Sequence, residues 1–308
     1  MLFRGITLLD QSAIDSYIKA GEAVKLAKRR AKDVVRRGVG LRTVCEEVEK
    51  TVLNLGCKPS FPCNICVNEI AAHYTPKEKT KITIPDNSLV KVDVGAHHNG
   101  FIADSAITVN VSSEYEELLQ AVNEALDNVV KEIKPNIKVS KISSIIEKTI
   151  KYYGFKPISN LAGHQLNKYV LHTGFIIPNV KSLRDLFTKL TPGNVYAIEP
   201  FATLKEGAGK VEARRGGNIF RLVSSRPPKM GAARSLFLEI QRRYKTLPFT
   251  PRWLTDLKKN PKYPKAFNSL MEKGYVSEYP YLVEGNKQPV AQSEHTFLIL
   301  EKEVITIT

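Results

Sequence analysis

Two aspartates, Asp93 and Asp104, lie within the apolar, strand-like stretch KVDVGAHHNGFIADSAITVN, residues 91–110. An ionised carboxylate that is buried without a partner is so costly that proteins pair it, protonate it or give it a metal ion. Asn99 and Gly100 favour a type I′ hairpin turn, because both positions of that turn need positive φ. A turn there places the two carboxylates on one face of the hairpin, as diagonal neighbours with Cα atoms roughly 7 to 8 Å apart. The stretch therefore predicts half of a metal site, although two solvated aspartates on an exposed hairpin would give the same pattern.

Further candidate ligands follow in the second half of the chain. His164 and His172 lie in NLAGHQLNKYVLHTG, Glu199 lies in the apolar GNVYAIEPFAT, and Glu294 precedes the last strand-like segment. Taken singly, a lone histidine is usually a satisfied polar residue and a glutamate at a strand end is usually solvated. Together with the aspartates, however, they supply four carboxylates and an imidazole. Such an oxygen-rich set with one nitrogen suits a pair of divalent ions such as Mn, Fe, Co or Zn.

An internal duplication indicates how these residues are brought together. Residues 39–59 align without gaps on residues 137–157, at a constant offset of 98 residues. Each copy predicts an amphipathic helix that ends at a glycine, Gly56 or Gly154, and is followed by an extended segment. A second helix is expected before each copy, at about residues 10–37 and 113–132. Two such α/β halves packed about a pseudo-twofold axis form one domain with a central cleft, which is where sites form.

Composition excludes several classes of protein. With 308 residues, 43% hydrophobic and 25% charged, the chain is typical of globular proteins of one large or two ordinary domains. The N-terminus lacks the features of a signal peptide, and no apolar run is long enough to span a membrane, so we expect a cytoplasmic protein with no membrane partner. The net charge of +15 favours polyanionic partners such as RNA or a ribosome, or reflects only a well-solvated surface.

The four cysteines do not form a recognisable metal or redox motif. Cys63 and Cys66 form CNIC in a strand-like segment, but Cys45 and Cys57 are twelve residues apart and form no second CxxC pair. Packed thiols are therefore favoured over structural zinc or a redox pair.

The strings NEIAAHYTP, VDVGAHHNGFIAD, GHQLNKYVLHTG, AIEPFAT and SEHT resemble the methionine aminopeptidases in order and spacing over nearly the whole chain. The resemblance implies an α+β fold of the two-halved "pita-bread" type. It is closest to the type II branch of archaea and the eukaryotic cytoplasm, which carries a helical insertion between the last two glutamate ligands. In this chain Glu199 and Glu294 are separated by 95 residues, more than a strand return needs. We expect a catalytic domain formed by residues 1–206 and 277–308, with an inserted subdomain at 207–276.

The resemblance also implies roles for individual residues. Two divalent ions, Co, Mn, Fe or Zn, would be bound by five ligands. These ligands are Asp93, Asp104, His164, Glu199 and Glu294. Glu199 would also act as general base, His73 and His172 would face the substrate, and Phe61 would line the pocket for the methionine side chain. Two features depart from the family: Cys63 and Cys66 replace small or aliphatic residues, and EGNKQPV replaces a loop that contains an aromatic residue.

The implied function is removal of the initiator methionine from nascent proteins whose second residue is small, by a monomeric enzyme. Two alternatives remain at this stage. Prolidases and Xaa-Pro aminopeptidases share the ligands, but they usually carry an extra N-terminal domain, whereas the first helix here begins near residue 10. A non-catalytic relative that binds ribosomes or RNA would suit the net charge, but the intact ligand set argues against it. Ribosome contact would use basic residues of the first helix and of the insertion. These are Lys25, Lys28, Arg29, Lys32 and Arg36, then Arg226, Lys229, Arg234, Arg242, Arg243 and Lys245.

Overall fold

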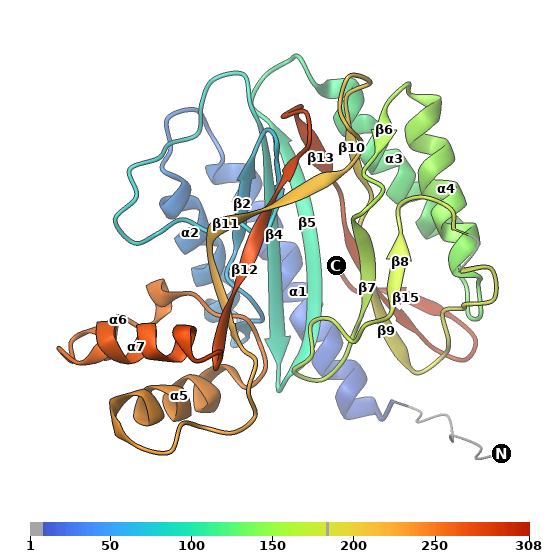
Figure 1. Cartoon of the computed structure of the whole chain (residues 1–308). Helices are drawn as coiled ribbons and strands as arrows, with labels where there is room; N and C mark the ends of the chain where they lie inside the picture. The colour runs from blue at the N-terminus through green and yellow to red at the C-terminus, as the bar shows by residue number, and fades with distance from the viewer. Residues whose placement is uncertain (1–8, 183–184) are drawn as a thin grey trace.

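The computed structural model describes residues 9–182 and 185–308, and its elements follow the duplicated order (Figure 1). The first half contains α1 (Gln11–Val34), α2 (Leu41–Asn54), β1 (Lys58–Pro59), β2 (Asn64–Val67), β3 (Ile70–Ala72), β4 (Leu89–His98) and β5 (Phe101–Asn110). The second half contains α3 (Glu116–Glu132), α4 (Val139–Tyr152), β6 (Lys156–Pro157), β7 (Ala162–Leu166), β8 (Ile176–Pro178), β9 (Asn194–Ile198) and β10 (Phe201–Thr203). The last strands are β13 (Val290–Gln292), β14 (His295–Ile299) and β15 (Val304–Thr306).

The duplication predicted from the sequence is confirmed by these bounds. Both ends of α2 and of β1 recur in α4 and β6 at the predicted offset. Gly56 and Gly154 follow the two helices with φ of 71° and 81°, a conformation that an L side chain rarely adopts. A glycine at the equivalent position therefore ends the equivalent helix in each half.

Each half has its own hydrophobic core, formed between a helix pair and a sheet. In the first half, α1 and α2 pack on the sheet in which β4 lies between β1 and β2 and also pairs with β5. In the second half, α3 and α4 pack near the sheet ordered β15-β14-β9-β7-β8. Figure 1 shows α2 at one side of the molecule and α3 and α4 at the other, whereas α1 runs behind β4 and β5 in this view.

The expected insertion at 207–276 contains a long strand as well as helices. It contains β11 (Val211–Leu222), α5 (Gly231–Tyr244), a 3-10 turn (Pro251–Trp253), α6 (Thr255–Lys258) and α7 (Tyr263–Glu272), and β12 (Val276–Glu284) follows it. The two strands pair antiparallel, and β12 also pairs with β3 of the first half. The helices enclose a separate hydrophobic cluster that includes Phe237, Ile240, Phe249 and Leu270. Figure 1 shows them projecting from one corner of the molecule. Among the described residues, none of the helices is long and apolar enough to cross a bilayer.

Candidate metal centre

The β4–β5 hairpin has the predicted turn and register. Asn99 and Gly100 have φ of 53° and 92°, as a type I′ turn requires. In the ladder Asp93 lies opposite Ala106, and Asp104 lies opposite Gly95. The two aspartates therefore share one face as diagonal neighbours, because side chains two residues apart point the same way.

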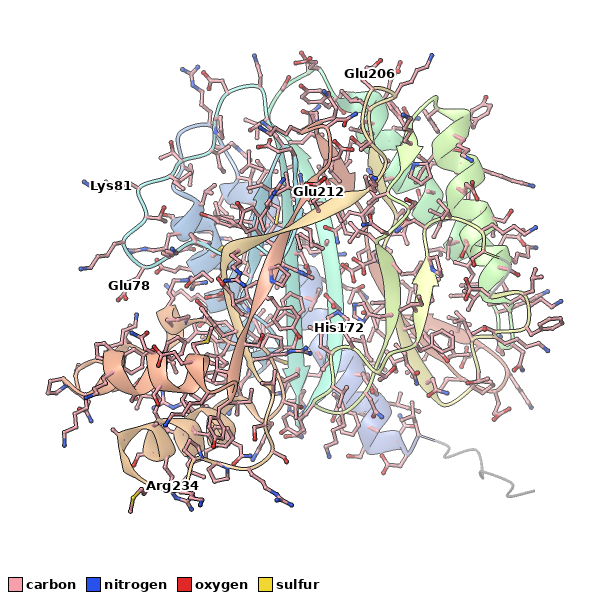
Figure 2. All side chains as sticks on the ribbon, viewed as in Figure 1. Glu78, Lys81, His172, Glu206, Glu212 and Arg234 are labelled. Carbon is pink, nitrogen blue, oxygen red and sulfur yellow. The ribbon has the colours of Figure 1, made fainter. Side chains whose placement is uncertain are left out.

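All eight site residues predicted from the sequence line a single cavity. The five candidate ligands come from different elements: Asp93 from β4, Asp104 from β5, His164 from β7, Glu199 just after β9, and Glu294 between β13 and β14. The remaining three are Phe61, His73 and His172. Figure 2 shows His172 near the centre of the molecule in this view, whereas Arg234 lies at the far edge of the inserted helices. The cavity thus joins residues of both halves.

The ligand atoms lie close enough to share a cation. One ligand atom each from Asp104, His164 and Glu294 lies within 4.8 Å of the others. His164 Nε2 is 3.7 Å from Asp104 Oδ2 and 3.9 Å from Glu199 Oε1. These separations exceed hydrogen-bond distance, so the imidazole and carboxylates face a common space rather than bonding to one another.

The clustered carboxyl groups would be stabilised in their ionised form by a nearby positive charge. Burial raises the pKa of Asp93 to about 7. Burial and neighbouring carboxylates raise the pKa of Asp104, Glu199 and Glu294 well above their usual range. Burial lowers the pKa of His164, which favours the neutral imidazole that binds metals. Four carboxylates therefore cannot all be ionised here without a cation.

The hydrogen bonding of the site also fits a metal. Among the described residues, no partner bonds the buried atoms Asp93 Oδ1, Asp104 Oδ1 or His164 Nδ1. Buried polar atoms are nearly always satisfied, so unpaired carboxylate oxygens in one cavity are typical of a cation site. The donor set, oxygen-rich with one imidazole, suits Mn, Fe, Co or Zn. The residues therefore fit a bound divalent metal.

Comparison with known proteins agrees with this chemistry. The profile of metallopeptidase family M24 matches residues 15–222. A methionine aminopeptidase from Methanocaldococcus jannaschii is 43% identical over 294 residues, which cover 94% of this chain and 98% of the relative. The chain belongs to the methionine aminopeptidases of family M24. The match to an archaeal relative over nearly its full length agrees with the type II branch inferred from the insertion.

Solved structures confirm the pita-bread fold expected from the sequence. A methionine aminopeptidase from Thermotoga maritima superimposes with a TM-score of 0.70 at 24% identity, covering 98% of this chain and 99% of that one. A prolidase from Pyrococcus furiosus gives a TM-score of 0.61 at 19% identity and covers 98% of this chain. The match spans 65% of that prolidase.

The two histidines that the methionine aminopeptidase resemblance assigns to the substrate lie beside the ligands. The His172 ring is 4.2 Å from the His164 ring, measured between centroids. His73 has φ of 64° and its ring contacts Tyr279 of β12 edge-on, at 5.7 Å. A non-glycine residue held at positive φ is strained, and such strain is concentrated at functional sites.

Two polar residues of the site were missed by the sequence analysis. Asn64 donates from Nδ2 to Asp93 Oδ2 at 2.6 Å, because the two residues are paired across β2 and β4. Gln292 donates from Nε2 to Glu199 at 3.2 Å and to Glu294 at 3.4 Å. Both are almost fully buried. Their polarity within otherwise apolar strands was the signal available in the sequence.

The departures from the methionine aminopeptidase pattern have local explanations. All four cysteines are free and buried, which confirms packed thiols. Cys45 Sγ donates to the carbonyl oxygen of Cys63 at 3.3 Å. The cavity also contains an aromatic side chain from β12, Tyr279, although the loop before Ala291 lacks one.

Proposed function

We propose that this chain removes the N-terminal methionine from nascent polypeptides by metal-dependent hydrolysis. The main observation in favour of this function is that four carboxylates and His164 line one cavity. His73, His172 and Phe61 line the same cavity. Membership of the methionine aminopeptidase family supports the same reaction. A free α-amino group would be held near the carboxylates, which would make the enzyme an exopeptidase.

We propose that two divalent ions are bound by Asp93, Asp104, His164, Glu199 and Glu294, with Co, Mn, Fe and Zn as candidate metals. When bound, such ions act as Lewis acids that polarise the scissile carbonyl and lower the pKa of water. Gln292 would orient Glu199 and Glu294, since it donates to both. Asn64 would do the same for Asp93.

Side chains of the protein would then transfer the protons and bind the substrate. Glu199 would take a proton from the attacking water and return it to the leaving amine. His172 would contact the peptide group at the cleavage point. His73, whose pKa is lowered by burial, would stabilise the developing charge or the departing nitrogen.

Selectivity would follow from the shape of the cavity. Phe61, Ile219 and Leu171 supply apolar wall, as the thioether side chain of methionine requires. An enclosed pocket of this kind also limits the size of the second residue. Cleavage is expected before Ala, Gly, Ser, Thr, Val, Pro and Cys, but not before Lys or Leu.

The test is methionine release from Met-Ala-Ser, Met-Lys-Ser and Ala-Pro-Ser by EDTA-treated protein, with and without added Co²⁺ or Mn²⁺. Metal-dependent release from Met-Ala-Ser alone is expected. Cleavage of Ala-Pro-Ser instead would indicate the prolidase-like alternative. A folded protein that cleaves none of the three with either metal would refute the proposal.

We further propose that the enzyme is a cytoplasmic monomer whose basic surface contacts the ribosome, and that residues 207–276 form an inserted subdomain. Lys25, Arg29 and Lys32 are exposed on α1, whereas Lys28 turns inward and donates to Ser105 at 2.7 Å. The docking surface would therefore be smaller than the helical spacing suggested. Failure to co-sediment with ribosomes even at low salt would contradict ribosome contact, and size-exclusion chromatography tests the monomer.

A further inference from the structure

The insertion contacts the first half of the chain through a buried ion pair. Arg252 of the 3-10 turn donates from Nη1 to Glu49 Oε2 at 2.6 Å and from Nη2 to Glu49 Oε1 at 2.9 Å. Both side chains are buried, with 7% and 6% of their surface exposed. Trp253 Nε1 donates to the same carboxylate at 2.9 Å. Glu49 of α2 is therefore held by two consecutive residues of the insertion.

The same ion pair holds two segments of the cavity wall. Glu49 Oε1 accepts from the backbone N–H of Cys63 at 3.1 Å. Arg252 Nη2 donates to Thr75 Oγ1 at 3.1 Å. Thr75 Oγ1 in turn donates to the carbonyl oxygen of Cys63 at 2.8 Å. Cys63 lies between the cavity residues Phe61 and Asn64, and Thr75 lies two residues after His73. A closed ring of hydrogen bonds thus joins the two walls to the insertion.

A second set of contacts reinforces the His73 side of this ring. Asn218 of β11 donates from Nδ2 to the carbonyl oxygen of Pro76 and to Thr250 Oγ1, both at 3.1 Å. The backbone N–H of Thr75 donates to the carbonyl oxygen of Gly217 at 3.0 Å. The segment that follows His73 is therefore fastened to the insertion at three points.

Stability alone is a poor explanation for a buried ion pair. Desolvation of two charges offsets most of their attraction, so well-packed apolar replacements are often as stable. Arg252 Nε also has no partner within the described part of the chain, so the pair is not fully satisfied. The bidentate bond between Arg252 and Glu49 does, however, fix the position of each segment bonded to the pair.

We propose that Arg252 and Glu49 are positioning residues through which the insertion sets the spacing between the Phe61 wall and the His73 wall. The insertion thereby contributes to selectivity for methionine. This inference rests on the proposed function. A change in spacing of a few tenths of an ångström alters which side chain fills the pocket, because apolar pockets discriminate by shape and size.

The test compares three variants with the wild type. Glu49→Leu combined with Arg252→Met removes both charges together and so leaves no unpaired buried charge. Thr75→Val removes the link between Arg252 and Cys63 with no change of charge and little change of shape. Arg243→Met is the matched control, since Arg243 pairs with Asp256 and Glu239 inside the insertion and reaches neither wall. Each variant is assayed with Met-Ala-Ser and Leu-Ala-Ser, by hydrogen–deuterium exchange over residues 60–67, and by thermal unfolding.

The double variant and Thr75→Val are expected to fold, to raise KM for Met-Ala-Ser more than they lower kcat, and to reduce the Met-to-Leu ratio of kcat/KM at least about fivefold. The amide of Cys63 should exchange at least about tenfold faster. Arg243→Met should change none of these. The inference would be overturned if Thr75→Val, or a folded double variant, kept both the wild-type Met-to-Leu ratio of kcat/KM and the wild-type exchange rate at Cys63. If the wild type releases no methionine, the proposed function fails, and the exchange measurement alone decides whether the ring positions this segment.

Discussion

Removing divalent cations should make the folded chain less stable as the pH rises from 7 to 8. The four clustered carboxyl groups have raised pKa values in the folded chain, to about 7 for Asp93 and well above the usual range for the other three. In the unfolded chain the same groups ionise near pH 4. Between these limits the folded chain binds more protons than the unfolded chain, so its free energy of unfolding falls with rising pH.

The size of the effect follows from proton linkage. Between pH 7 and 8 Asp93 alone contributes a loss of well under about 1 kcal/mol, given its pKa of about 7. Each further carboxyl that keeps its proton across this range contributes a loss of about 1 kcal/mol. A net loss of about 1 kcal/mol or more is therefore expected if at least one of Asp104, Glu199 and Glu294 remains protonated.

Other buried groups oppose this loss only in part. Burial lowers the pKa of His73 and His164, so both are neutral in the folded chain, and their contribution to stability is lost only as the pH falls below about 6.5. Burial lowers the pKa of Lys28 and Lys91 to about 8, so both begin to lose protons between pH 7 and 8, and the stability linked to them rises. Together the two lysines offset the contribution of Asp93, so a net loss reports the carboxyl groups that keep their protons.

The assay is urea unfolding in EDTA, followed by circular dichroism and by the fluorescence of Trp253, the only tryptophan. Saturating Mn²⁺ should abolish the loss, because bound cations hold the carboxylates ionised. Glu294→Gln should reduce the loss by removing one titrating group. Glu206→Gln, on an exposed loop at the edge of the molecule (Figure 2), should not. A metal-free protein whose stability is constant or rises between pH 7 and 8 would refute this account of the site.

Three further predictions concern single substitutions. His73→Ala should lower turnover strongly while metal content, measured by mass spectrometry, stays near the wild-type value; lost metal would make His73 a ligand. Asp104→Asn should weaken metal binding at least about 100-fold in a chelator competition, and unchanged affinity would remove Asp104 from the ligand set. Gly95→Ala should raise KM for Met-Ala-Ser about tenfold, because the new methyl group would lie 2.2 Å from Phe61 Cε1 and 2.1 Å from Ser60 Oγ. Unchanged KM in a folded variant would show that Phe61 does not shape the pocket.

The parts of the fold that depend on local patterns were predictable from the sequence. The type I′ turn at Asn99 and Gly100 determined the register of the hairpin, and register determined that Asp93 and Asp104 share a face. The helix-ending glycines Gly56 and Gly154 and the repeated apolar spacing determined the matching bounds of α2 and α4. Each of these features follows from residues within one turn, hairpin or helix.

Features that depend on contacts between distant segments were not predictable. Gln292 reaches Glu199 across 93 residues, and Arg252 reaches Glu49 across 203. The sequence separation of neither pair predicts a contact, because no helix, turn or hairpin period connects residues so far apart in the chain. Residues 207–276 were expected to form a helical insertion, and they also contain the long strand β11, which pairs with β12. Pairing of β12 with β3 brings the Tyr279 strand beside the cavity. Tertiary pairing, rather than local preference, determined that outcome.

The duplicated fold accounts for why the candidate site is so acidic. Asp93 and Asp104 come from the first half, His164 and Glu199 from the second, and Glu294 from the strands that follow the insertion. Neither half alone supplies the full set of candidate ligands, so the cluster forms only when the halves dock. Docking without metal brings together carboxylates that must keep protons, whereas docking with metal ionises them. The bound cations would therefore stabilise the interface between the halves as well as the reaction, which is why metal content and folding stability should vary together in this chain.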